Sequence, residues 1–132
     1  MIFVDTSYWI ALQLPRDANH DEARRLLERV GGDSLVTSNH VRGETWTLLR
    51  RRAWHGAAVR FLDRVDESAR LQIEFVSERL EQDALMWLRR HDERPYSFVD
   101  ATSFALMRSF GVREALAFDD DFEAAGFIVL RA

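Results

Sequence analysis

Four carboxylates stand at positions from which a fold could bring them together. Asp5 and Asp119 each follow a short apolar run, so both are expected at the carboxyl ends of buried strands. Asp100 falls in the first turn of an expected helix, and Glu44 interrupts the apolar stripe of another. Acids that meet in this way repel one another, and one of them would take up a proton unless a cation were bound.

A Mg²⁺ or Mn²⁺ ion fits such a cluster, because these hard cations prefer carboxylate and water oxygens. Mg²⁺ usually keeps several waters, which leaves room for a phosphate oxygen and an attacking water. The chemistry that this arrangement supports is hydrolysis of a phosphodiester bond. Four hydroxyl groups close to the acids in sequence could orient the water or a carboxylate: Thr6, Ser7, Thr102 and Ser103.

Each acid also has a purely structural interpretation. Asp100 can be the acid of a capping box, and the run Asp119-Asp120-Asp121 can be a turn that caps a short helix. Asp5 and Glu44 are harder to explain in this way, because each breaks an apolar pattern. Spacing alone does not rank Asp121 against Asp119. The four acids together favour a metal site over four separate structural roles.

The acids are positioned by helices that alternate with short apolar strands. Strands are expected at residues 2–4, 35–37, 71–76, 115–118 and 127–130, and helices at 8–12, 20–30, 40–52, 56–68, 77–91 and 97–110. Asn19 with Glu22 resembles a capping box, and Asn39 is a good N-cap for the helix that follows it. Alternation of this kind predicts an α/β fold with a short central parallel sheet and helices on both faces, and residues 1–132 are expected to form a single domain.

Composition excludes several classes of protein. The 132 residues contain no cysteine, which excludes a disulfide, a thiolate zinc site and a cysteine nucleophile. All 18 basic side chains are arginine, which excludes any mechanism that needs a lysine. No apolar run approaches the ~18 residues of a membrane span and no signal peptide is recognisable, so a cytoplasmic protein without a membrane partner is expected. The net charge of −4 argues against bulk attraction to nucleic acid but allows a local RNA site.

Arginine, tryptophan and histidine give weaker signals. Arg42, Arg50, Arg51 and Arg52 lie on one expected helix and are candidates for contacts to RNA phosphates, although a solvated helix end is the simpler explanation of the three consecutive arginines. The tryptophans at positions 9, 46, 54 and 87 are expected in the core. The four histidines show no metal-ligand spacing, so structural or surface positions are expected for them.

The order of the acidic motifs resembles the PIN-domain ribonucleases, and within them the VapC toxins of toxin–antitoxin pairs. The resemblance extends over essentially the whole chain. It depends on Val4-Asp5-Thr6-Ser7 at the start, Glu44 followed by residues 45–49, residues 97–103 at the start of a late helix, and Ala117-Phe118-Asp119 with Asp121-Phe122 near the end. Each motif is short, but the four in this order and spacing are specific.

This resemblance implies a Mg²⁺- or Mn²⁺-dependent endoribonuclease whose catalytic, metal-binding carboxylates are Asp5, Glu44, Asp100 and Asp119, with Asp121 as a supporting acid. It also implies a homodimer and a cognate antitoxin that masks the site. Residues 37–49 and 90–103 resemble the branch of the family that cuts the sarcin–ricin loop of 23S rRNA in the large ribosomal subunit. A PIN nuclease directed at tRNA or mRNA is the alternative within the family.

Two other classes of protein fit less well. A phosphoryl-transfer receiver or a phosphatase also places an aspartate at a strand end. Both families rely on a lysine, which this chain lacks, and no D-x-D motif follows the first expected strand. A noncatalytic binding module that keeps only the fold is disfavoured because all four acids are present.

Overall fold

Five parallel strands form the central sheet. The computed structural model describes residues 1–132, and its strands are β1 (Ile2–Val4), β2 (Leu35–Ser38), β3 (Leu71–Glu74), β4 (Glu114–Leu116) and β5 (Ile128–Val129). Their order across the sheet is β3-β2-β1-β4-β5, and every neighbouring pair is parallel. The first strand of the chain is thus the central strand of the sheet.

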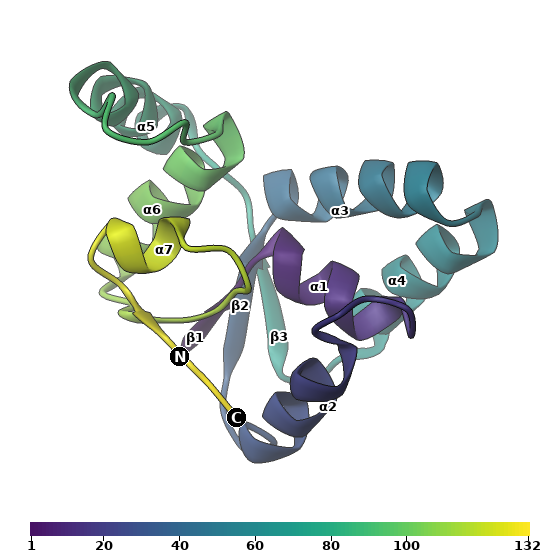
Figure 1. The fold of residues 1–132 in the computed structure, drawn as a ribbon. Helices are drawn as coiled ribbons and strands as arrows, with labels where there is room; N and C mark the ends of the chain where they lie inside the picture. Colours follow the sequence, from purple (N-terminus) through teal and green to yellow (C-terminus); the bar gives the residue numbers. More distant parts are fainter.

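Helices connect the strands and cover both faces of the sheet (Figure 1). One side carries α1 (Thr6–Gln13), α2 (His20–Arg29), α3 (Asn39–Arg52) and α4 (His55–Glu67), and the other carries α5 (Glu78–Arg90), α6 (Phe98–Phe110) and α7 (Asp121–Ala124). This arrangement confirms the predicted α/β fold. No helix combines the length and the apolar character that crossing a membrane requires.

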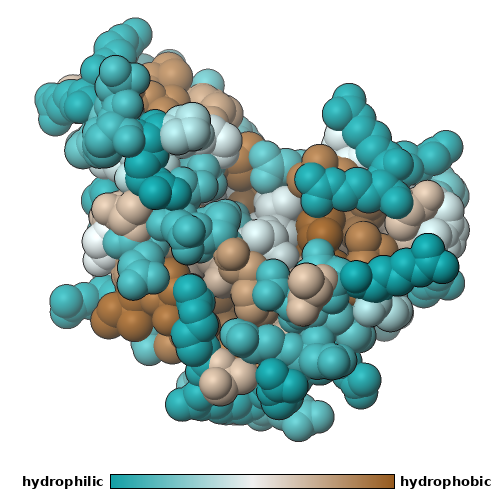
Figure 2. Space-filling model, in the orientation of Figure 1, coloured by the Kyte–Doolittle hydropathy of each residue, from teal (hydrophilic) through white to brown (hydrophobic).

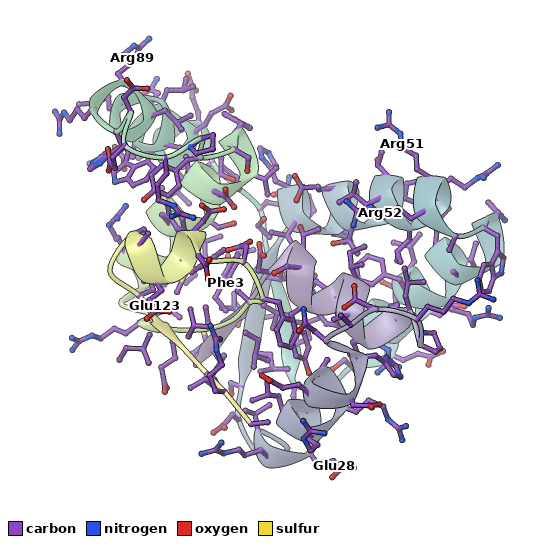
Figure 3. The ribbon with its side chains drawn as sticks, in the orientation of Figure 1. Phe3, Glu28, Arg51, Arg52, Arg89 and Glu123 are labelled. Carbon is purple, nitrogen blue, oxygen red and sulfur yellow. The ribbon has the colours of Figure 1, made fainter.

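The central strands are buried because helices cover them on both sides. All three residues of β1 and all four residues of β2 are buried. A strand in this environment has no face in water, so it needs no alternation of polar and apolar side chains. On one side of the sheet Phe3 packs against Phe122 of α7, with ring centroids 5.9 Å apart (Figure 3).

Two of the expected helix caps are wrong, and other hydrogen bonds explain the difference. Asn19 precedes α2, but its side chain makes no capping bond, and its backbone N–H donates to Asp17 Oδ1 at 2.8 Å. Ser38, not Asn39, caps α3 with its side-chain oxygen. Asn39 is the first residue of α3, and its side chain accepts the backbone N–H of Val76 at 2.9 Å.

Some strand ends and one tryptophan also differ from expectation. β3, β4 and β5 end earlier than the apolar runs that predicted them. In β4 the strand ends at Leu116, and the N–H of Phe118 bonds to Ser7 Oγ instead of a neighbouring strand. Trp9 is buried as expected, but Trp54 is 53% exposed. Trp54 stands at the N-cap of α4, where the chain turns out of α3, and the Arg60 guanidinium lies 5.4 Å from its ring centroid.

Candidate active site

Asp5 and Asp119 lie at the carboxyl edge of the sheet, where the strand order changes direction. From β1 the chain adds β2 and β3 on one side, and then adds β4 and β5 on the other side of β1. A crevice forms outside the strand ends at such a switch point, and α/β proteins bind ligands there. Asp5 follows β1 directly and Asp119 follows β4 after a short connection. The topology therefore brings together two acids from opposite ends of the sequence.

The hydroxyl group of Ser7 connects these two strand ends. Asp5 is the N-cap of α1, and its Oδ2 accepts the Ser7 N–H at 3.1 Å and the Ser7 Oγ–H at 2.6 Å. The same Oγ accepts the backbone N–H of Phe118 at 2.9 Å. One hydroxyl group thus orients Asp5 and fixes the residue that precedes Asp119.

Asp100 combines a structural position with a place in the acidic cluster. It completes a capping box at the start of α6, because its Oδ2 accepts the Ser97 N–H and Ser97 Oγ accepts the Asp100 N–H, both at 3.0 Å. Asp100, Asp5 and Asp119 each place one carboxylate oxygen within 4.8 Å of the others. The cap therefore does not compete with the cluster, since it fixes the orientation of Asp100 within it.

Each of the three acids accepts at least one hydrogen bond from a protein donor. Asp119 Oδ1 accepts the backbone N–H of Asp121 at 3.0 Å, while Asp5 and Asp100 use Oδ2 for their bonds to Ser7 and Ser97. One oxygen of each acid lies within 4.8 Å of one oxygen of each of the other two. Three oriented carboxylate oxygens are therefore available to a ligand at one point.

Burial raises the pKa of all three acids, and the charges of neighbouring carboxylates add to this effect. Burial raises the pKa of Asp5 well above its ordinary value, and the charge of Asp119 raises it further. Burial raises the pKa of Asp100 to about 6, although the hydrogen bonds from Ser97 act in the opposite direction. Burial also raises the pKa of Asp119. Without a cation, this cluster holds protons more tightly than separate carboxylates in water.

The acids open on a mainly polar pocket of about 350 Å³. Glu44, Leu48 and Arg52 of α3 form part of its wall. Figure 3 shows Arg52 on the side of α3 that faces α1, and Figure 2 shows that the surface is hollowed between the parts formed by α5 and α3. A positive side chain thus stands beside a group of carboxylates.

Glu44 lies at this pocket but outside the three-acid group. The expectation that it points toward the core is wrong, because α3 buries only Val41, Thr45 and Leu49. Glu44 is half-buried at the pocket wall and forms no ion pair. Its charge reaches solvent, so it needs no buried partner.

Asp121 begins α7, lines the same pocket and is paired with Arg94. Arg94 Nε and Nη2 both lie 3.0 Å from Asp121 Oδ1. Arg94 comes from the segment between α5 and α6, and no role was predicted for it. Nothing in the spacing of two residues 27 positions apart indicates this contact.

The hydroxyl residues divide into two pairs. Thr6 and Ser7 line the pocket, and the Thr6 Oγ1 atom is buried without a hydrogen-bond partner. Thr102 and Ser103 are fully buried in α6 and do not line the pocket. Both of their hydroxyl groups donate to the carbonyl oxygen of Val99, at 2.9 and 2.8 Å. The fold therefore brings only the first pair to the acids.

The four candidate RNA-binding arginines also separate. Arg52 lines the acidic pocket, and Arg51 lines an adjacent hollow of about 600 Å³ that shares Glu44 with it. The Arg42 guanidinium lies 5.6 Å from the ring centroid of Phe75, and Arg50 is exposed without lining either space. Asp17 and Asn19, from the loop between α1 and α2, also line the acidic pocket, and neither residue was predicted to lie there.

Comparison with protein families agrees with this geometry. The family described as "PIN domain" matches residues 2–128. The chain therefore belongs to the PIN-domain family, as its acidic motifs indicated.

Within that family the chain is similar to VapC20 of Mycobacterium tuberculosis. VapC20 is described as a 23S rRNA-specific endonuclease in two strains, CDC 1551 / Oshkosh and ATCC 25618 / H37Rv. Both sequences are 54% identical to this chain over 131 residues, which cover 99% of this chain and 98% of the relative. The crystal structure of M. tuberculosis VapC20, described as a sarcin–ricin loop cleaving toxin, matches with a TM-score of 0.94 and 52% identity over 100% of both chains. VapBC2 from Rickettsia felis, solved with a DNA fragment from its promoter, has a TM-score of 0.71 and 14% identity over 98% of both chains, which shows the shared fold alone.

Proposed function

We propose that this chain is an endoribonuclease toxin of the VapC type that cuts 23S rRNA at the sarcin–ricin loop. The observation that carries the proposal is the group of three carboxylate oxygens, from Asp5, Asp100 and Asp119, at the switch point of the sheet. The substrate is taken from VapC20, which is similar over nearly the full length of both chains. Metal-assisted hydrolysis of a phosphodiester bond is the reaction that such a group of acids serves.

The donor set fits Mg²⁺ or Mn²⁺. Three carboxylates provide hard oxygen ligands, which these ions prefer. Their pKa values are raised first by burial and then by neighbouring carboxylate charges, and a divalent cation would favour their ionised forms. Thr6 supports the same conclusion, because its buried Oγ1 has no partner within the protein. When bound, the ion would lower the pKa of a water molecule and stabilise negative charge on the phosphate oxygens.

The residues of the chain have distinct tasks in this proposal. Asp5, Asp100 and Asp119 hold the ion, and Ser7 and Ser97 keep the first two oriented. Glu44 supplies a fourth carboxylate from α3. Arg52, on the same helix, attracts the RNA phosphate, since a guanidinium can donate two parallel hydrogen bonds to phosphate oxygens. Thr6 lines the same pocket, and its buried hydroxyl group has no hydrogen-bond partner within the protein.

The remaining expectations concern assembly and place of action. The chain acts as a single PIN-domain unit in the cytoplasm, where its ribosomal substrate is found, and it forms a homodimer. A cognate antitoxin of the VapB type neutralises it by masking the acidic pocket. These statements about assembly and location are carried over from the VapC family by analogy.

The test is an assay of RNA cleavage by the purified chain freed of antitoxin. Intact ribosomes, tRNA and mRNA are incubated with it in Mg²⁺, in Mn²⁺ and in EDTA. The comparison variants are Asp5→Asn and, as a matched control, Asp66→Asn, which alters an exposed aspartate of α4. One metal-dependent cut in 23S rRNA, lost in Asp5→Asn and kept in Asp66→Asn, is expected.

The other outcomes of this assay are equally decisive. A cut confined to tRNA or mRNA would keep the nuclease and overturn the ribosomal target. Cleavage that persists in Asp5→Asn or in EDTA would overturn the assigned site. The absence of any cut, with Mn²⁺ still bound, would favour a noncatalytic binding module.

A further inference from the structure

A second and larger hollow lies between α5, α6 and α7. Its volume is about 930 Å³, at the upper end of the ~300–1,000 Å³ range of small-molecule sites. Half of its lining residues are polar or charged, so it is not an apolar groove of the kind that buries a helix. No residue of this hollow has been given a function so far.

Aromatic rings form one part of the hollow. The rings of Trp87 and His91 are stacked, with centroids 4.2 Å apart and an angle of 23° between their planes. Tyr96 meets the edge of Trp87 at 4.6 Å. Met86, on the same helix, is 48% exposed. The wall therefore offers flat and polarisable surface of the type on which a nucleobase stacks.

Arginines form another part, and two of them have no carboxylate partner. The Arg108 guanidinium lies 5.6 Å from the ring centroid of Trp87 and 5.3 Å from that of Phe127, and it makes no ion pair. Arg90 also lines the hollow without an ion pair. The acids of the hollow differ in this respect, because Asp83 faces Arg79 and Glu93 bonds to His91 at 2.7 Å. The free charge in the hollow is thus positive.

The hollow and the acidic pocket share a wall. Asp121, at the first position of α7, lines the acidic pocket, and Ala124 and Ala125, about one helical turn later, line the hollow. The segment before α6 has the same arrangement, since Ser97 lines the pocket and its neighbour Tyr96 lines the hollow. The Arg94–Asp121 ion pair joins the two parts of this wall.

We propose that the hollow binds a nucleotide of the RNA substrate that flanks the phosphate held at the acidic pocket. Its base stacks against the His91–Trp87 pair, and its phosphate accepts hydrogen bonds from Arg108 and Arg90. The strand crosses the shared wall between the two spaces. This inference depends on the proposed function only in taking RNA as the ligand. Unpaired guanidinium groups beside aromatic rings favour RNA over a peptide segment as the occupant.

The test measures RNA binding without cleavage. The probe is a labelled sarcin–ricin loop hairpin in Mn²⁺, and the background is Asp5→Asn. Arg108→Gln and Arg90→Gln are compared with Arg89→Gln, which removes the same charge from an arginine that points away from the body of the protein (Figure 3) and does not line the hollow. The Arg108 side chain packs on several rings, so Arg108→Gln could fail to fold. Arg90→Gln keeps the test valid in that case.

Each hollow variant is expected to weaken binding by about tenfold and to reduce the salt dependence of log K by about one unit, and Arg89→Gln is expected to do neither. Stacking is checked separately, since the hairpin should quench tryptophan fluorescence less in Trp87→Phe than in the background protein.

The results separate this inference from the proposed function. Equal affinities for the three arginine variants, with cleavage by the wild type intact, would overturn the nucleotide site and leave the nuclease standing. Weaker RNA binding in the hollow variants, with no cleavage by the wild type, would support the nucleotide site and overturn the nuclease. Loss of antitoxin binding or of dimer formation, with RNA affinity unchanged, would assign the hollow to a protein and overturn the inference.

Discussion

Ser7 donates its hydroxyl proton to Asp5 Oδ2 across 2.6 Å, and this bond orients the first acid of the site. The Ser7 Oγ atom in turn accepts the backbone N–H of Phe118, so the serine also fixes the end of β1 to the segment that follows β4. A side chain of this kind affects both the stability of the sheet and the geometry of the acids.

We therefore expect Ser7→Ala to lower both stability and metal affinity. The variant leaves the Phe118 N–H without its partner, which costs roughly 1–3 kcal/mol of unfolding free energy. Thermal unfolding with and without Mn²⁺ measures the two effects, because the stabilisation by the ion follows its affinity. Ser34→Ala, which alters an exposed serine without a side-chain hydrogen bond, is the control. An unchanged Mn²⁺ response in Ser7→Ala would argue against the orienting role.

Ser97→Ala separates helix capping from support of the site. Ser97 and Ser77 each cap a helix with the side-chain oxygen, but only Ser97 bonds to a member of the acidic cluster. Loss of either cap should cost about 1 kcal/mol. Calorimetric titration with Mn²⁺ should then show weaker binding in Ser97→Ala and unchanged binding in Ser77→Ala. Equal affinities in the two variants would mean that the cap has no influence on the acids.

Stability in EDTA should fall as the pH rises. A buried acid whose pKa is raised in the folded state binds its proton more tightly there than in the unfolded chain. Its contribution is fully present below the unfolded value of about 4 and is lost as the pH passes through the folded value. For Asp100, whose pKa burial raises to about 6, the loss is on the order of 3 kcal/mol at about 1.4 kcal/mol per unit.

Denaturant unfolding at a series of pH values from about 4 to about 7 measures this loss. Asp100→Asn should flatten the curve, because the amide does not titrate, and saturating Mn²⁺ should flatten it in the wild type. A curve with the same slope in Asp100→Asn and the wild type would show that other groups govern the pH dependence.

Asp119→Asn and Asp121→Asn should differ in their effect on cleavage. Asp119 belongs to the three-acid group, whereas Asp121 is neutralised by Arg94 and supplies a backbone N–H that the variant retains. Asp119→Asn should lower kcat by at least ~10²-fold, and Asp121→Asn by about tenfold or less. Single-turnover cleavage of 23S rRNA measures both. The reverse order would place Asp121 nearer to the ion.

Arg52→Gln should weaken RNA binding more than Arg50→Gln does. Both arginines are exposed residues in the last turn of α3, but only Arg52 lines the acidic pocket. Its loss should reduce affinity severalfold and lower the slope of log K against log salt by about one. Anisotropy titrations at several salt concentrations provide the measurement. Equal slopes for the two variants would indicate that the arginines at the end of α3 attract RNA by long-range electrostatics and that Arg52 makes no local contact.

The sequence was sufficient to predict the architecture and the meeting of three acids. Apolar runs predicted β1 and β2 correctly because both faces of these strands are covered. The acids that follow β1 and β4 meet because parallel strands end at one edge of the sheet. Asp100 could be read in two ways from its spacing, and the structure supports its capping role within the cluster. These features depend on local pattern and on topology.

Contacts that depend on side-chain direction could not be predicted. Glu44 has the spacing of a buried residue, yet α3 buries only Val41, Thr45 and Leu49, and Glu44 lines the pocket beside them. Thr102 and Ser103 are adjacent to an acid in sequence, but inside a helix their hydroxyl groups bond to the preceding turn. The Arg94–Asp121 pair joins two segments whose approach depends on how α7 packs.

β1 is the first strand made during translation, but it lies between β2 and β4 in the finished sheet. Asp5 therefore emerges from the ribosome long before Asp119, and until the Phe118 segment follows, the Ser7 hydroxyl has no N–H to accept. The acidic centre cannot form before the segment that follows β4 has been made. A nuclease whose proposed substrate is the ribosome thus has no working site while only the earlier strands have been synthesised.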